Sequence, residues 1–357
     1  MNNQPNYYPI PIAPQPQPPK QKASGAAITA LVLSIISVVL IVVLFFVSIG
    51  MWASLLMMQS QKFLDMYTEA LDEITAAEEG GITFDDPAVE AAIREALNKP
   101  HGTVTEKDML GITILDIMPE GPSVFSIDVL RYCHNLAELW VSHKSYNETA
   151  LSDISALRDL HKLHTLYLYS TNVTDITPLE GHTNLRKLIL IANNIRENDS
   201  RELEGHELIE TFSELRELYL NGFYNIDDIS SISNLTNLTD LSLLNCSVTD
   251  VKPLSKMTKL EWLDLEGNNI LSVSPLENLT NLRFLRIDRL ESGDIKPLEN
   301  LTNLKSLLLS NFKIKSIEPI KKLTNLEYAD LCNLGLTPAQ QNELEKALPN
   351  CEFNFYD

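Results

Sequence analysis

Cysteine and basic residues are both scarce in this sequence, and each shortage excludes a class of function. Only four cysteines occur among 357 residues, and no two of them form a C-x-x-C pair. Neither a zinc site nor a disulfide framework is therefore indicated, and free buried or half-buried thiols are expected. Lysine and arginine total 28 against 48 acidic residues, a net charge of −20. Phosphate binding needs a basic face, so this balance argues against nucleic acid as a partner.

Charge is missing altogether from one long stretch. Residues 1–61 contain Lys20 and Lys22 and no acid, so the rest carries 26 basic and 48 acidic residues, or −22. Residues 26–58 have no charge, and positions 26–49 are almost entirely apolar. About 20 such residues span a bilayer, which predicts a transmembrane helix at 26–58. The alternative, a cleaved signal peptide, has a shorter apolar region that ends in small residues.

The segments on either side of 26–58 suggest an orientation. Lys20 and Lys22 precede the apolar run, whereas Lys62 is followed by acidic residues. Basic residues stay cytoplasmic, so we expect a single-pass, signal-anchor protein of the cell membrane with the repeats outside. Residues 1–25 predict a disordered Pro/Gln-rich cytoplasmic tail, either a spacer or a ligand for a proline-reading domain. Residues 59–81 predict a helical juxtamembrane stalk.

Enzyme signatures are also missing. The sequence has no H-E-x-x-H, G-x-S-x-G, P-loop or paired Cys/His pattern. Nearby acidic residues such as Asp264 and Glu266 are expected on a strongly acidic chain and do not indicate acid–base chemistry. We therefore expect no enzymatic activity, no cofactor and no metal.

A repeat dominates the second half of the chain. Leucines at 238, 260, 282, 304 and 326 recur every 22 residues, and each opens the phrase L-x-x-L-x-[LI]. A short polar patch, a β-branched residue, a Pro-Leu pair and an L-T-N close follow. This period and leucine spacing indicate a leucine-rich-repeat solenoid. Earlier units open at 136, 163, 185 and 215, with two longer steps among them.

Both ends of the repeat region differ from the repeat. Residues 82–84 predict a short strand, Asp85 or Asp86 before Pro87 predicts a helix start, and Thr105 with Asp108 predicts another. Thr337 before Pro338 starts a last helix, in which Leu344 and Ala347 are expected to pack, and residues 352–355 predict a final strand. Such caps cover the open ends of a solenoid core.

These residues carry a family resemblance. The run ITFDDPAVEAAIREALNKPHGTVTEKDMLGITILDI (82–117) resembles the N-terminal cap of internalin-like leucine-rich-repeat proteins of Gram-positive bacteria. The phrase x-D-I-x-P-L at 174–179 and, with valine, at 249–254 is similar to their 22-residue repeat. The resemblance covers roughly residues 82–357. It implies the fold, whereas relatives bind different proteins through different surfaces.

The predicted fold is an α/β solenoid, a leucine-rich-repeat arc with a parallel β-sheet on its concave face. It has a small helical N-terminal cap, a C-terminal helix–strand cap and one N-terminal transmembrane helix. The expected domains are the tail 1–25, the transmembrane helix 26–58, the stalk 59–81, the N-terminal cap 82–135, the repeats 136–337 and the C-terminal cap 338–357.

Residues between the repeat leucines should face the concave side, because side chains alternate along a strand. Outward aromatics are typical of binding surfaces, but they also stabilise sheets by cross-strand pairing. The candidate ligand-binding residues are Trp140, Tyr167, Tyr169, Ile189, Ile191, Tyr219, Trp262, Phe284 and Arg286.

A second candidate element is the insertion at 196–214. Leu203, Leu208, Ile209 and Phe212 suggest a small helix there, as either a binding element or a solvated bulge. The favoured function is a membrane-anchored extracellular protein that binds a protein ligand for adhesion or scaffolding. The alternatives are binding of cell-wall carbohydrate and signalling through the Pro-rich tail. No motif identifies the ligand or the oligomeric state.

Overall fold

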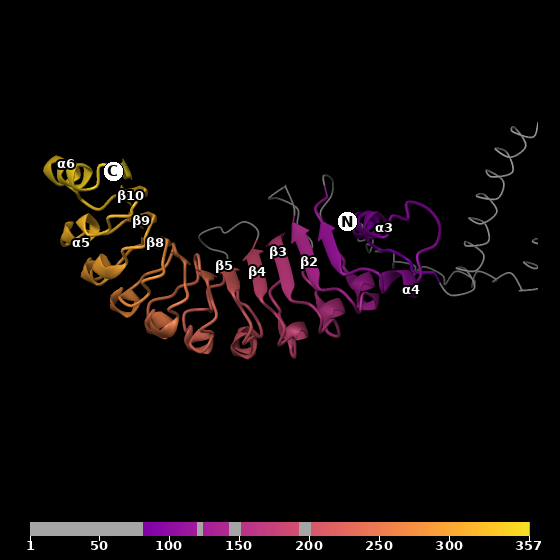
Figure 1. Cartoon of the computed structure of the whole chain (residues 1–357). Helices are drawn as coiled ribbons and strands as arrows, with labels where there is room; N and C mark the ends of the chain where they lie inside the picture. The colour runs from indigo at the N-terminus through magenta and orange to yellow at the C-terminus, as the bar shows by residue number, and fades with distance from the viewer. Residues whose placement is uncertain (1–80, 120–123, 143–150, 193–200, 357) are drawn as a thin grey trace, which may run out of the picture. The chain divides into compact units, whose positions relative to one another are not determined.

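The computed structural model describes residues 81–119, 124–142, 151–192 and 201–356. Eleven parallel strands form one sheet in the order of the sequence, on the inner side of a curved stack (Figure 1). The strands are β1 (Ile114–Ile117), β2 (Glu138–Ser142), β3 (Thr165–Thr171), β4 (Lys187–Ala192), β5 (Glu217–Asn221), β6 (Asp240–Ser242), β7 (Trp262–Leu265), β8 (Phe284–Asp288), β9 (Ser306–Ser310), β10 (Tyr328–Cys332) and β11 (Glu352–Asn354).

Short helices line the outer side of the stack (Figure 1). Most begin at an aspartate whose carboxylate accepts the backbone N–H two residues on, as Asp250 does from Lys252 at 2.8 Å. That bond and the following proline fix the first turn, which explains the x-D-[IV]-x-P-L phrase. The helices are η1 (Asp128–Tyr132), η2 (Ser155–Leu157), η3 (Thr177–Leu179), η4 (His206–Thr211), η5 (Ser230–Ile232), η6 (Lys252–Lys256), η7 (Ser274–Leu276), η8 (Lys296–Asn300) and α5 (Glu318–Lys321).

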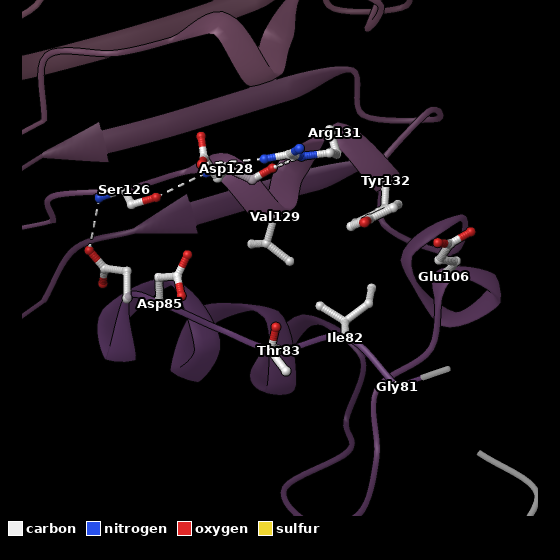
Figure 2. A pocket seen from close by; sticks show the side chains of 11 residues that line it. Gly81, Ile82, Thr83, Asp85, Glu106, Ser126, Asp128, Val129, Arg131 and Tyr132 are labelled. Carbon is white, nitrogen blue, oxygen red and sulfur yellow. Dashed lines mark hydrogen bonds and ion pairs between the residues drawn. The ribbon is translucent and has the colours of Figure 1, made fainter. Parts of the chain in front are cut away.

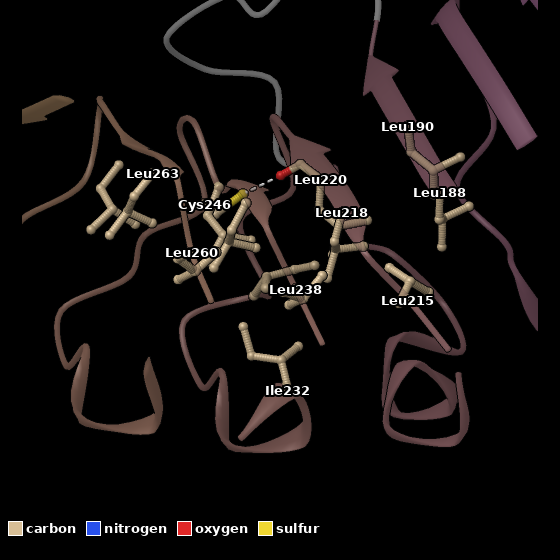
Figure 3. Close-up of a cluster of buried hydrophobic side chains, with 14 of the residues drawn as sticks. Leu188, Leu190, Leu215, Leu218, Leu220, Ile232, Leu238, Cys246, Leu260 and Leu263 are labelled. Carbon is tan, nitrogen blue, oxygen red and sulfur yellow. Dashed lines mark hydrogen bonds between the residues drawn. The ribbon is translucent and has the colours of Figure 1, made fainter. Parts of the chain in front are cut away.

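Inward-facing leucines form the core between these two layers. Leu241, Leu263, Leu285 and Leu307 occupy one register position on successive strands, and all are fully buried. Figure 3 shows equivalent leucines from neighbouring repeats packing in one cluster. Burying each side chain contributes about 1.5–3 kcal/mol, so the stack is held by apolar burial that each repeat shares with its neighbours. The predicted leucine-rich-repeat solenoid is confirmed for the part of the chain that the structure describes.

The turn after each strand satisfies its own polar groups. Asn268 is fully buried; its Oδ1 accepts from the Cys246 and Val248 N–H groups, and its Nδ2 donates to the Leu243 carbonyl. Cys246 occupies the same position one repeat earlier, and its thiol donates to the Leu220 carbonyl (Figure 3). Cys246 is therefore one of the free buried thiols that the sequence predicts, and its role is structural.

Another asparagine position explains the L-T-N close of the repeat. The Asn281 side chain donates to the Thr258 carbonyl of the previous turn at 2.7 Å. Asn303 and Asn325 repeat the contact with Thr280 and Thr302 at 2.8 Å each. These bonds link successive outer turns, so the asparagines are a structural element of the repeat.

The N-terminal cap is organised by Asp86. Helix α3 (Pro87–Ala96) begins after it, and its Oδ1 accepts the N–H groups of Ala88 and Val89. Its Oδ2 accepts from Phe125 at 2.7 Å and Ser126 at 3.2 Å, so one carboxylate fixes the helix to a distant segment. The second start is also confirmed, because α4 (Glu106–Met109) has the expected capping box.

One prediction for this cap is wrong. Residues 82–84 are not a strand: among the described residues, one backbone bond of the ladder kind involves them, from the Ile82 N–H to the Val104 carbonyl. The first strand is instead β1, which pairs with β2 and places Leu115 and Ile117 in the core. The sheet therefore begins one strand before the first predicted repeat at residue 136.

The C-terminal cap largely follows the prediction. Helix α6 (Pro338–Ala347) starts with a capping box between Thr337 and Gln340, and β11 adds to β10. Leu344 packs fully in the core, but Ala347 is exposed and Leu348 is buried in its place. The chain leaves the helix at Leu348, which turns that side chain inward.

The described part of the insertion belongs to the outer side of the solenoid. Leu203, Ile209 and Phe212 are buried, and η4 is the small helix expected there. Glu204 forms a parallel bridge with Asp175, and a Cβ on Gly205 would lie 3.1 Å from the Thr177 nitrogen. Residues 201–214 are thus packed into the structure, and the remainder of the insertion lies outside the described residues.

The predicted tail, transmembrane helix and nearly all of the stalk also lie outside the described residues. Within the part that the structure describes, no helix is long and apolar enough to cross a membrane.

Candidate functional site

Strand register places the outward side chains in rows across the concave face. The central row runs Trp140, Tyr167, Ile189, Tyr219 over β2–β5, and each pair is directly opposite in the sheet. Parallel strands lie about 4.8 Å apart, so neighbours in a row are in contact. The predicted residues of this region therefore form one continuous surface, which we call the aromatic half.

The aromatic rings of this half pack against each other. The centroids of Trp140 and Tyr167 are 5.0 Å apart, with their planes tilted by 30°. Tyr167 and Tyr169 are 6.2 Å apart and nearly parallel. Trp140, Tyr167, Tyr169, Ile191 and Tyr219 each retain partial exposure. Mutual packing holds their rotamers, so the surface is ordered before any ligand binds.

Ile189 departs from the prediction. It faces the concave side, but only 5% of its surface is exposed. Its register neighbours Tyr167 and Tyr219 stand on either side and cover it. Ile189 is therefore a support beneath the rings rather than a contact residue.

A lysine adjoins the aromatic half. The Lys187 ammonium lies 5.3 Å from the centre of the Trp140 ring and 2.5 Å from a Glu217 carboxylate oxygen. A cation over an indole face is attracted by the negative charge of the π-system. Lys187 thus occupies a position between an aromatic ring and an acid.

The potential around Tyr219 is negative. Burial, and next the charges of Asp240, Glu217 and Asp264, raise the pKa of Tyr219 to about 12. The phenol therefore remains protonated at neutral pH and can donate a hydrogen bond. Carboxylates close to an aromatic surface favour a partner that carries positive charge.

Trp262, Phe284 and Arg286 form a second group on β7 and β8. The rings of Trp262 and Phe284 stack at 3.6 Å with an angle of 3° between their planes. Arg286 pairs with Glu266 at 2.6 Å and lies 4.0 Å from Asp264. Strand β6, with Asp240 and Ser242 facing outward, separates this group from Tyr219. The nine predicted residues therefore lie in two groups on one face.

Carboxylates in the second group are unusually buried. Asp264 is 8% exposed, and burial raises the pKa of its carboxyl despite the nearby Arg286 and the Glu266 N–H. Burial likewise raises the pKa of Glu266. Burial of a carboxyl group disfavours its charged form unless a cation lies close to it.

Sequence reasoning missed two exposed apolar side chains in and just after β1. Ile114 is 56% exposed and precedes Glu138 in its row, and Met118, just after the strand, is 50% exposed. The sequence I-T-I-L-D-I carries the repeat spacing and predicts these outward positions once β1 is counted as a strand. In the central row, β1 contributes the exposed Asp116 opposite Trp140, so the aromatic half ends at β2 and the two apolar side chains flank that aspartate.

A separate cleft of about 250 Å³ lies between the N-terminal cap and η1 (Figure 2). Asp85, Asp86, Glu106 and Asp128 line it, with Arg131. Asp86 is saturated by backbone N–H groups, and Arg131 pairs with Asp128 at 3.3 Å. Asp86 and the Asp128–Arg131 pair thus have their partners within the cap, and these contacts hold its segments together. Across the described ranges, no group of histidine, cysteine or acidic residues has the arrangement of a metal site.

Comparison with known proteins gives structural similarities only. No family model matches the chain, and no curated protein matches its sequence. An internalin (inlF) from Listeria monocytogenes is 26% identical, covers 76% of this chain and 95% of its own, and has a TM-score of 0.43. Internalin C2 (inlC2) of the same species is 25% identical, with coverages of 76% and 94% and a TM-score of 0.39. The functional domain of InlJ, also from that species, is 16% identical, with coverages of 77% and 69% and a TM-score of 0.47. The chain is thus similar in structure to internalins. Its repeat fold is assigned from the strand register and the core packing described above.

Proposed function

We propose that this chain is a membrane-anchored, non-enzymatic binding protein that holds a protein ligand on the aromatic half of its concave face. The observation that carries the proposal is the row Trp140, Tyr167, Ile189 and Tyr219, in which the three rings are partly exposed. Ordinary soluble surfaces rarely gather so many large apolar side chains, and tryptophan and tyrosine dominate protein-binding hot spots.

The supporting sheet favours this role. The candidate side chains project from regular parallel strands, and Ile189 supports them from below. A rigid base reduces the entropy lost on binding, because the side chains are already fixed by their neighbours. The uncharged run at 26–58 supports an anchor in the cell membrane, and Lys20 and Lys22 support a cytoplasmic amino terminus, with the repeats outside and available for adhesion or scaffolding.

Binding of wall carbohydrate is the alternative on the same surface. Two rings of the aromatic half are tilted against each other by 30°, which suits an irregular protein surface better than a flat sugar ring. Signalling through residues 1–25 remains compatible with either ligand. The proline-rich tail would then connect the bound state outside to a cytoplasmic domain.

The test is a triple replacement of Trp140, Tyr167 and Tyr219 by alanine in the full-length chain. Partner capture should fall by about 100-fold or more, since each hot-spot residue contributes roughly 2 kcal/mol or more. The matched control replaces Tyr328, a half-buried ring on β10, and should leave capture unchanged. A folded triple variant that captures its partner normally would disprove the proposal.

A further inference from the structure

The concave face carries two aromatic–acid pairs, Trp140 with Glu217 and Trp262 with Asp240. Register places Lys187, Glu217, Asp240, Trp262 and Phe284 side by side on β4–β8. Lys187 already fills the first pair, between the Trp140 ring and the Glu217 carboxylate. This internal contact shows which kind of group such a position accepts. The second pair is Asp240 with Trp262.

Asp240 is half-buried, and among the residues that the structure describes no cation pairs with it. Its Oδ2 accepts a hydrogen bond of 2.6 Å from the Thr239 hydroxyl. Within the described ranges, no lysine, arginine or histidine nitrogen lies within salt-bridge distance of it. Lys187 pairs with Glu217, and Arg286 pairs with Glu266. The groups that act on Asp240 are Glu217 and Glu261, which repel its charge, and Lys187, which attracts it more weakly.

Trp262 offers one free ring face beside this acid. Phe284 stacks on the other face at 3.6 Å, and 37% of the tryptophan surface is exposed. The side chain that follows in the row, on the side away from Phe284, is Asp240. A planar cation at this point would contact the indole by cation–π stacking and the carboxylate by a charge-assisted hydrogen bond.

We propose that Asp240 and Trp262 form a notch that receives an arginine side chain of the bound protein, so that the partner presents a basic segment to strands β5–β7. Arginine fits better than lysine, because its flat guanidinium stacks on a ring and still donates to an acid. The surrounding Glu217, Asp264 and Glu266 add negative potential, in keeping with the excess of acidic residues. This inference rests on the proposed function, since it names the chemistry of the same ligand.

The experiment titrates the full-length chain with an acetylated and amidated tri-arginine peptide by calorimetry at low salt. Asp240→Asn and Trp262→Leu should each weaken binding by about tenfold or more, because each removes one of two contacts to the guanidinium. Tri-citrulline, which has the same shape without the charge, should not bind measurably. Thermal melts of both variants verify that they are folded.

The matched control is Asp330→Asn, which removes the same charge from a partly buried aspartate on β10. It should weaken tri-arginine binding by less than about twofold. Equal losses in Asp240→Asn and Asp330→Asn would mean that the peptide responds to net charge alone, and the inference would be overturned. Binding of tri-citrulline as tight as that of tri-arginine would overturn it as well.

The two proposals fail in different ways. If the triple aromatic replacement abolishes partner capture while Asp240→Asn preserves it, the proposed concave site is supported and the proposed arginine notch is disproved. If neither change affects capture, both fall.

Discussion

The two halves of the concave face share one core and differ in the balance of apolar and charged side chains that point away from it. The aromatic half on β2–β5 has mainly rings and aliphatic side chains, with one ion pair between Lys187 and Glu217. The strands β6–β8, which we call the charged half, combine one stacked pair of rings with Asp240, Asp264 and Arg286. Beneath both, the leucine columns are equally buried. The repeat thus constrains the inward positions, while the outward positions vary freely and can be specialised for a ligand.

The halves also differ in how their outward groups are stabilised. In the aromatic half, the rings cover one another and Ile189, so apolar burial within the face stabilises the sheet. In the charged half, Asp264 is desolvated with an arginine 4.0 Å away. Such acids contribute little to stability, which fits a role in attracting a basic partner.

The largest expected effect on stability concerns the turn that follows each strand. In the two halves, different polar side chains occupy the same position of this turn. Asn268→Ala leaves the buried N–H groups of Cys246 and Val248 without an acceptor, so the free energy of unfolding should drop by roughly 3 kcal/mol. Thr171→Ala, at the same position in the aromatic half, should cost less than about 1 kcal/mol. Urea denaturation measures both, and equal losses would mean that the turns are equivalent.

A histidine makes the aromatic half sensitive to pH. His182 is fully buried at a position that leucine fills in other repeats, such as Leu235 and Leu279. Burial, and next the charge of His161, lower the pKa of His182. The folded chain therefore binds fewer protons here than the unfolded chain, and stability is lost as the pH falls below about 6.5, by up to about 1.4 kcal/mol per pH unit.

His182→Leu tests this dependence. The variant should lose less stability than the parent between pH 7 and pH 5, measured by urea denaturation at each pH. His134→Gln changes an exposed histidine and serves as the control with the parent's pH profile. An unchanged slope in His182→Leu would show that another group carries the pH dependence.

The smallest effect concerns the turn residue that follows each strand. Ser170, Asn245, Gly267 and Asn311 share one repeat position, and all have positive φ. Serine tolerates this region poorly, so Ser170→Gly should stabilise the aromatic half by about 0.5–1 kcal/mol in thermal or urea unfolding. Gly267→Ala should do the opposite in the charged half, since its Cβ would lie 1.8 Å from the Asn245 side chain. A loss in Ser170→Gly would mean that the serine hydroxyl outweighs the backbone strain.

Much of this fold follows from periodicity. The spacing of Leu238, Leu260 and Leu282 predicts the inward column, and the Asp and Asn positions of the repeat predict the outer turns. Both depend on local contacts that recur in each unit, so one unit predicts the next. The helix starts at Asp86 and Thr337 follow from capping chemistry for the same reason.

The remaining features depend on contacts between different repeats. That Ile189 is covered follows from the two tyrosines beside it, which alternation along one strand does not reveal. The stacking of Trp262 on Phe284 likewise depends on register across strands, as does the finding that no cation among the described residues pairs with Asp240. The sequence did not predict β1, because residues 112–117 match the repeat pattern only once and begin with isoleucine in place of leucine.

The most direct test of the central claim is photo-crosslinking from defined positions in cells that express the full-length chain. A benzoylphenylalanine at Tyr169, within the aromatic half, should crosslink to one discrete protein. The same group at Thr236, an exposed residue in an outer turn, should crosslink to none. A discrete crosslink from Thr236 with none from Tyr169 would contradict the account and place the partner on the convex side.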